Sequence, residues 1–168
     1  MHNTPLLIKA YVALGANLGD PVVTVRAAIG ALKNIAGTRF SAASSLYRTA
    51  PVGLHHQPDF INAVAMLEVN AAVLPAPTFL EHLFAIEARF GRQRSIKNAP
   101  RTLDLDLLLF GDQQLDLPGL MLPHPRMTER AFVLTPLTEI APDLVIPGHG
   151  PITPLLADVA RQQIERLP

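Results

Sequence analysis

The segment 104–110, with the sequence DLDLLLF, constrains the fold more than any other part of the chain. Apart from its two aspartates it is entirely apolar, so in an extended segment both alternating faces would be buried. Its length is ordinary for a strand and far too short to cross a bilayer. The segment therefore predicts a central, buried strand that carries two carboxylates.

The composition is that of a globular chain without a strong charge preference. Of its 168 residues, 49% are hydrophobic and 17% are charged, which suits one folded domain with a sizeable core. Lys plus Arg equals Asp plus Glu, so no overall basic field favours nucleic acid or an anionic membrane. The absence of cysteine excludes a disulfide scaffold and a thiolate metal site. Without a signal-peptide pattern, we expect a single cytoplasmic domain over 1–168, with a flexible tail at 1–5.

The periodicity of apolar residues predicts an alternation of strands and helices. Extended patterns cover residues 6–14, 39–47, 60–69 and 104–110, and helical patterns cover 21–35 and 75–90. The order strand, helix, strand, strand, helix, strand is typical of a ferredoxin-like α+β fold, βαββαβ, and we expect its helices on one face of the sheet. The proline-rich remainder predicts a C-terminal appendage with short helices near 129–140 and 154–161.

The two aspartates of the buried strand are the first candidate functional residues. Asp104 and Asp106 would project from the same face of a strand, about 7 Å apart. Two like charges in an apolar setting are costly unless another group offsets them. A hard divalent cation such as Mg²⁺ is one such group, because it favours carboxylates together with phosphate oxygens and water. An ion pair with Arg101 or another arginine of the basic segment 89–101 is the other, and the spacing leaves both interpretations open.

The predicted strand 60–69 presents a second mixed face. Its odd-numbered residues form an apolar face, whereas Phe60 and Asn62 project from the opposite face. An aromatic ring followed two residues later by an amide suits a flat heterocycle, because the ring can stack on it and the amide can hydrogen-bond its edge. The alternative is that Phe60 belongs simply to the core. The loop predicted at 49–58 contains His55 and His56, which we expect to face solvent.

Several segments together resemble the 6-hydroxymethyl-7,8-dihydropterin pyrophosphokinase family. The segment 97–108, KNAPRTLDLDLL, is similar to the family's signature. Similar pieces occur in the family's order: VALGANLG at 12–19, YRTAPVG at 47–53, QPDFINA at 57–63, IE at 86–87, GRQR at 91–94, LPH at 122–124 and RAF at 130–132. The resemblance implies a ferredoxin-like fold and transfer of diphosphate from ATP to the hydroxymethyl group of the dihydropterin, giving AMP, in folate biosynthesis. It also implies two Mg²⁺ ions.

The resemblance implies roles for individual residues as well. Asp104 and Asp106 would hold the magnesium ions, while Arg92 and Arg101 would assist the phosphates during transfer. Phe60 and Phe132 would sandwich the pterin. The other residues implied on the pterin side are Thr49, Pro51, Val52 and Asn62. Those implied to contact ATP are Glu87, Arg94, Arg101, Leu107, His124 and Arg130.

Three positions depart from the family's usual pattern on the adenine side. Phe84, Asn98 and Pro125 stand where the family often has glutamine, tryptophan and tyrosine, so contacts to adenine and the closing loop are expected to differ here. Another Mg²⁺-dependent, nucleotide-using transferase with an Asp-x-Asp site is the alternative enzyme, and a non-catalytic ferredoxin-like module is the alternative outside enzymes. Neither explains the aspartates and the aromatic residues together. We expect a monomer that uses small-molecule substrates and binds neither nucleic acid nor membrane.

Overall fold

The computed structural model describes residues 6–51, 56–91 and 102–168. Its longer elements are β1 (Leu7–Ala16), α1 (Pro21–Leu32), β2 (Thr38–Ala43), β3 (Tyr47–Thr49), β4 (Phe60–Asn70), α2 (Ala76–Arg89), β5 (Asp104–Phe110) and α3 (Ala131–Ile140). The shorter ones are β6 (Leu115–Leu117), β7 (Leu120–Leu122), the 3-10 helix η1 (Met127–Glu129), β8 (Val145–Ile146), β9 (Gly150–Pro151), α4 (Ile152–Asp158) and β10 (Glu165–Arg166).

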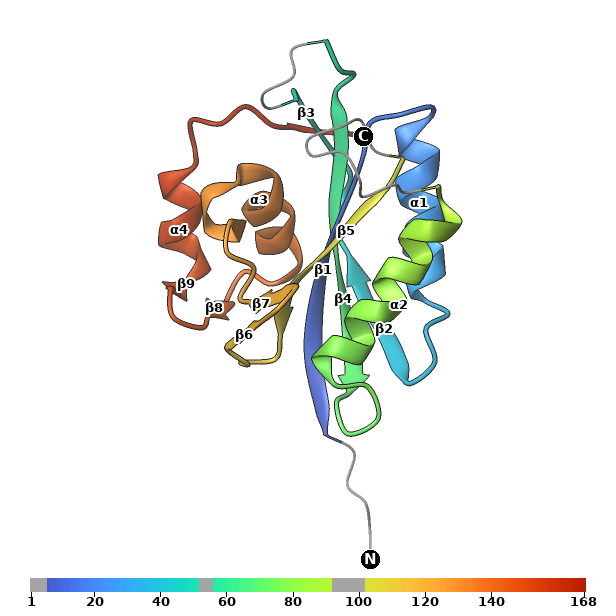
Figure 1. Ribbon diagram of the computed structural model, residues 1–168. Helices are drawn as coiled ribbons and strands as arrows, with labels where there is room; N and C mark the ends of the chain where they lie inside the picture. Colours follow the sequence, from blue (N-terminus) through green and yellow to red (C-terminus); the bar gives the residue numbers. More distant parts are fainter. Residues whose placement is uncertain (1–5, 52–55, 92–101) are drawn as a thin grey trace, which may run out of the picture.

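One antiparallel sheet organises this mixed α/β chain. Its strands lie in the order β10-β3-β4-β1-β5, and β2 pairs with the same strand, β4, as β3 does. Helices α1 and α2 cover one face, and α3 and α4 cover the other (Figure 1). The residues expected to form an appendage thus supply the second helical layer. No helix in the described part of the chain is long and apolar enough to cross a membrane.

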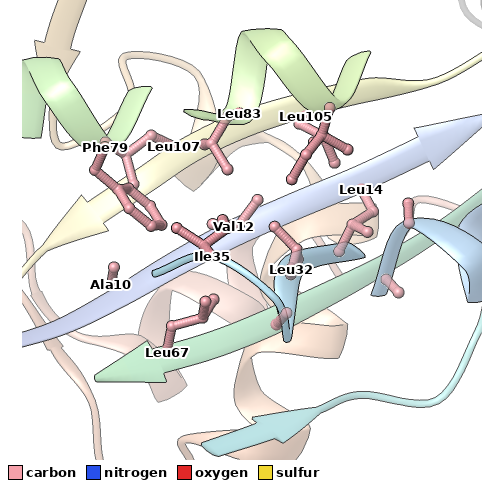
Figure 2. Close-up of a cluster of buried hydrophobic side chains, with 14 of the residues drawn as sticks. Ala10, Val12, Leu14, Leu32, Ile35, Leu67, Phe79, Leu83, Leu105 and Leu107 are labelled. Carbon is pink, nitrogen blue, oxygen red and sulfur yellow. The ribbon is translucent and has the colours of Figure 1, made fainter. Parts of the chain in front are cut away.

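Two apolar cores result from the alternation of side chains along the strands. In β1, Val12 and Leu14 face α1 and α2, where they pack with residues such as Leu83 and Leu105 (Figure 2). Tyr11 of the same strand belongs to the second core, on the side of α3. The sheet is therefore buried on both faces, as the apolar strand patterns require.

The prediction that 104–110 forms a central strand was wrong, although its burial was predicted correctly. Among the described strands, β5 lies at the edge of the sheet and pairs with β1 alone. A bulge at Leu108 shifts the register against β1 and turns both Leu108 and Leu109 into the α3-side core. The outer edge of β5 is covered instead by α2 and the segment after β7, because the Leu108 carbonyl accepts the His124 N–H at 2.9 Å.

The strand expected at 39–47 is divided at Ser44 into β2 and β3. The Ser44 hydroxyl accepts the Val64 N–H at 2.9 Å, while the Ser44 N–H donates to the Val64 carbonyl, also at 2.9 Å. A side-chain oxygen thus takes a bond that the backbone would make in a regular ladder. As a result the chain bends here, and Thr49, which was expected in a loop, ends β3.

Helix boundaries follow the local signals more closely. The Asp20 side chain accepts the Val23 N–H at 3.3 Å, and Pro21 occupies the first helical position of α1, as predicted. The helix expected at 129–140 is preceded by η1 and begins at Ala131. The helix expected at 154–161 spans Ile152–Asp158.

Candidate functional site

The candidate residues of three strands lie on one face of the sheet, the face covered by α3. Asp104 pairs with Gly15 of β1, and Gly15 pairs in turn with Asn62 of β4. Because directly opposed residues share a face, Asp104 and Asn62 point to the same side, two strands and about 10 Å apart. Asp106 follows on the same face by the two-residue period of the strand. The structure thus brings the predicted acids and the predicted amide to one surface.

Gly15 has no side chain to occupy the space between Asp104 and Asn62. A Cβ atom added there would lie 3.2 Å from Oδ1 of Asn62, closer than ordinary van der Waals contact. A larger side chain at this position would therefore displace the Asn62 amide and fill the space above the strand. The glycine leaves room for a ligand between the carboxylate and the amide.

The Asn62 amide is held in a defined orientation. Its side chain is only 5% exposed, and Nδ2 donates to Oγ1 of Thr49 at 2.9 Å. Thr49 pairs with Phe60, the half-buried first residue of β4, and Pro51 follows two residues later. Four residues predicted on the pterin side are thus neighbours at one end of β3 and β4.

Asn17, which sequence reasoning did not assign, supports this end of β4. It is 1% exposed, and its Nδ2 lies 3.0 Å from Oε1 of Gln57 and 3.3 Å from the carbonyl oxygen of Pro58. These bonds tie the end of β1 to the segment that leads into Phe60. Its place directly after Gly15-Ala16, within a segment that resembles the family, was the available signal.

Glu87 is buried between α2 and β5. It is 1% exposed, and its Oε2 accepts the N–H of Leu105 at 2.7 Å. Leu105 lies between the two aspartates, so this carboxylate fixes the backbone that carries them. A role toward ATP would pass through β5 rather than through an exposed carboxylate.

A groove of about 320 Å³ runs along the outer edge of β5, between α2 and the β6-β7 hairpin. Its walls are largely apolar and include Leu80, Phe84, Leu117, Leu120, Met121 and Pro125. Asp106 and His124 bring polar side chains to the same groove, which therefore reaches the aspartate pair. The Leu105 N–H points to the outer edge of β5. Because the N–H and C=O groups of every second residue in a strand point to the same edge, those of Leu107 point to the outer edge as well.

His124 carries a neutral ring at neutral pH. Burial lowers its pKa, Arg130 and Arg126 lower it further, and Asp104 opposes them in part. The Arg126 N–H donates to Nδ1 at 3.2 Å. The proton of the neutral ring therefore resides on Nε2, which can donate to a ligand in the groove.

Arg130 and Phe132 form a stacked pair where η1 meets α3. The guanidinium carbon of Arg130 lies 5.3 Å from the centre of the Phe132 ring, a cation–π arrangement. The two residues were predicted to serve different substrates, and the structure places them in contact. Any ligand that stacks on Phe132 therefore lies close to a positive charge.

Glu139 links α3 to the corner between β2 and β3. Its carboxylate accepts the N–H of Ser45 at 2.8 Å, the hydroxyl of Ser45 at 3.0 Å and the hydroxyl of Tyr47. Burial and then the bond to Glu139 raise the pKa of Tyr47 to about 12. Burial alone would raise the pKa of Glu139, but the hydrogen bonds from Tyr47 and Ser45 outweigh it and the pKa is lowered. Tyr47 pairs with Asn62, so the linkage reaches the site.

Four predicted site residues lie outside the described residues: Val52, Arg92, Arg94 and Arg101. The same holds for His55 and Asn98. Their assigned roles stay predictions from the sequence.

The aspartate pair is chemically suited to magnesium. No group of three or more His, Asp or Glu side chains that could hold a metal occurs within the described ranges. Mg²⁺ does not require such a group, because it is usually bound by one or two carboxylates, substrate phosphates and water. Asp104 and Asp106 are half-buried, and Asp106 also borders the groove, where phosphate oxygens could complete the shell.

Comparison with known proteins gives a consistent result. A family model described as 7,8-dihydro-6-hydroxymethylpterin-pyrophosphokinase matches residues 11–142. The 2-amino-4-hydroxy-6-hydroxymethyldihydropteridine pyrophosphokinase of Pseudomonas aeruginosa is 47% identical over 163 residues, which cover 97% of this chain and 99% of the relative. The Haemophilus influenzae protein of the same name is 40% identical over 161 residues, which cover 96% and 99%.

Solved structures share the fold at lower identity. The crystal structure of Plasmodium falciparum HPPK-DHPS A437G with STZ-DHP has a TM-score of 0.70 and 13% identity. The match covers 93% of this chain but only 46% of that one, so this chain spans about half the length of that structure.

Proposed function

This chain belongs to the 7,8-dihydro-6-hydroxymethylpterin-pyrophosphokinase family, and from that premise we propose how its residues divide the reaction. It is an ATP-dependent diphosphokinase of folate biosynthesis, which transfers diphosphate from ATP to 6-hydroxymethyl-7,8-dihydropterin and gives AMP. The observation that carries the assignment of residues is that an aspartate pair and an oriented amide lie on one face of the sheet, and that a groove along the outer edge of β5 reaches Asp106.

For the fold, we propose a ferredoxin-like arrangement, which is a more specific description than mixed α/β. The antiparallel order β5-β1-β4-β2, with α1 and α2 on one face, supports a ferredoxin-like core to which the residues after β5 are added. We treat 1–168 as one domain that acts as a monomer in the cytoplasm and binds neither nucleic acid nor membrane.

Asp104 and Asp106 would hold two magnesium ions. Bound there, the ions would neutralise phosphate charge and favour in-line displacement at the β-phosphorus. The chain's own contribution is to fix both carboxylates on one strand, since Glu87 bonds the intervening backbone N–H. In the reaction, the hydroxymethyl oxygen forms a bond to the β-phosphorus, the bond from that phosphorus to the α,β-bridging oxygen breaks, AMP leaves, and the hydroxyl proton passes to water.

The dihydropterin would lie at the open ends of β3 and β4. Phe60 and Phe132 would stack on its two faces, and the Asn62 amide would bond its polar edge above Gly15. Thr49 holds that amide through a hydrogen bond, so the amide is oriented before the ligand arrives. Pro51 and Val52 would complete the pterin side.

ATP would place its base in the groove along β5. The backbone of Leu107 would bond the base edge, and the apolar walls, which include Phe84, would pack on its faces. Nε2 of His124 and the guanidinium of Arg130 would contact the phosphates. The remaining residues assigned to ATP and to phosphate transfer are Glu87, Arg92, Arg94 and Arg101.

Product analysis tests the function. We expect AMP to form only when 6-hydroxymethyl-7,8-dihydropterin, ATP and Mg²⁺ are all present, with the dihydropterin diphosphate in equal amount. ADP as the nucleotide product would favour a different transferase and reject the proposal. Omission of each component in turn, with the Asp106→Asn protein as an inactive control, separates turnover from contaminating phosphatases.

A further inference from the structure

Gln162 bridges two distant parts of the chain, although it lies outside the residues that the family model matches. It follows α4, in a turn closed by a bond of 3.0 Å from its own N–H to the carbonyl of Val159. Its side-chain Oε1 accepts the N–H of Ala131 at 2.8 Å, and its Nε2 donates to the carbonyl of Glu129 at 2.8 Å. One carboxamide thus bonds the backbone on both sides of Arg130.

The bond from the Ala131 N–H to Gln162 supplies α3 with the cap that its own N-cap residue does not provide. Arg130 is the residue before α3, and its side chain makes no capping bond to the helix. The first N–H groups of a helix have no partner within the helix, and a nearby Ser, Thr, Asp or Asn usually supplies one. Gln162 supplies it from 31 residues away. If the amide were turned over, its NH₂ group would face the Ala131 N–H and its oxygen would face the Glu129 carbonyl. Both hydrogen bonds therefore require the observed orientation of the Gln162 amide.

The same C-terminal segment also reaches the other half of the pterin side. Glu165 and Arg166 form β10, which pairs with Arg48 and Tyr47 of β3, and the Leu167 N–H donates to the Leu46 carbonyl at 2.9 Å. β3 ends at Thr49, whose hydroxyl orients the Asn62 amide. Residues 162–167 therefore contact both the start of α3 and the strand that faces it.

We propose that Gln162 is a positioning residue for the dihydropterin, acting by fixing the backbone at Arg130 and with it the ring of Phe132. The inference rests on the proposed function, in which Phe132 stacks on the pterin. Stacking depends on the placement of a whole ring, and a frayed first turn of α3 would leave that ring without a fixed position. Gln162 itself touches neither substrate.

The test compares Gln162→Ala with Gln163→Ala, because Gln163 is exposed on the same segment and serves as a matched control. We expect Gln162→Ala to raise the KM for dihydropterin about 3- to 10-fold, the effect of losing a helix cap, and Gln163→Ala to leave it unchanged. Gln162→Glu keeps an acceptor for the Ala131 N–H at a helix N-terminus but loses the donor to the Glu129 carbonyl, so it should restore the affinity only in part. Equal KM values for the two alanine variants would overturn the proposal.

A double-mutant cycle separates positioning from general destabilisation. In a Phe132→Ala background, Gln162→Ala should cause no further loss of dihydropterin affinity, since the ring it positions is gone. Fully additive losses would count against the proposal. Amide hydrogen exchange supplies a readout without catalysis: protection at 129–134 should fall in Gln162→Ala and persist in Gln163→Ala. A wild-type protein that makes no AMP would reject the proposed function, whereas active variants with unchanged affinity and exchange would reject only the role of Gln162.

Discussion

The proposed pterin side and the proposed nucleotide side of this site differ in how their side chains are held. On the pterin side, polar groups bond one another before any ligand binds: Thr49 bonds Asn62, and Glu139 bonds Tyr47. On the nucleotide side, the described walls of the groove are mainly apolar, and a strand edge supplies backbone groups. The first arrangement favours selectivity for one heterocycle edge, because a ligand without matching groups leaves buried polar atoms unpaired. The second favours packing, which discriminates less.

The junction of the two sides should be the most sensitive point. We expect Asp106→Ala to lower kcat by about 10³-fold or more, the loss expected when a metal-held phosphate contact disappears. Its melting temperature should stay close to that of the wild type, because Asp106 is only half-buried. Asp112→Ala, an exposed acid just after β5, is the control and should keep full activity. Near-normal turnover of Asp106→Ala with magnesium would sink the metal assignment.

On the pterin side, Asn62→Ala should weaken dihydropterin binding by about 10-fold or more, since one buried, oriented amide is lost. Equilibrium titrations with dihydropterin and, separately, with Mg-ATP measure the change in affinity for each ligand. The affinity for ATP should change little. Asn70→Ala, at the other end of the same strand, provides the comparison. If Asn62→Ala weakened the binding of dihydropterin and of Mg-ATP equally, Asn62 would not serve the pterin side alone.

On the nucleotide side, Phe84→Ala should raise the KM for ATP only about 3-fold, because the ring is 39% exposed and only part of it can pack on the base. The kcat and the affinity for dihydropterin should be unaffected. Val73→Ala removes another exposed apolar side chain away from the groove and should alter neither constant. A loss of dihydropterin affinity in Phe84→Ala would contradict the assignment of the groove to ATP.

The smallest effect concerns the pH dependence of stability at Glu139. Its folded-state pKa is below the ordinary value of 4.5, so its bonds stabilise the fold above that pH and are lost as pH falls through the lowered pKa. Glu139→Gln should therefore flatten the acid side of the melting-temperature profile by a few degrees. Glu81→Gln, an exposed acid on α2, should leave the profile as in the wild type. An unchanged acid limb in Glu139→Gln would show that the carboxylate adds nothing.

Some elements of the structure could be predicted from the sequence and others could not. The period-two pattern of β4 and the Asp20-Pro21 helix start depend on near neighbours, and both predictions were confirmed. The position of β5 in the sheet was predicted wrongly, because an apolar strand covered by a helix and a hairpin has the same pattern as a central strand. The break at Ser44 depends on the Val64 N–H twenty residues away, which no local pattern records.

The candidate site divides in the same way. Asp104 and Asp106 were candidates because of their spacing on a predicted strand, and Asn62 because of its place opposite an apolar face; their roles stay predictions. The contributions of Asn17, Glu139 and Gln162 come from bonds across 40, 94 and 31 residues, respectively. Such polar residues have ordinary surface explanations in a single sequence, so only the folded arrangement reveals them. Glu87 was noticed, but its burial against Leu105 was not.

The pairing of β10 with β3 has a practical consequence for handling the protein. Glu165 and Arg166 lie beside the strand that ends at Thr49, so a tag or fusion partner joined after Pro168 would begin next to the proposed pterin entrance (Figure 1). β1 begins opposite Asn70, at the far end of β4, about 33 Å from Phe60 by the rise per residue. Purification handles and surface-immobilisation linkers therefore belong at the N-terminal end, where they leave the catalytic face accessible.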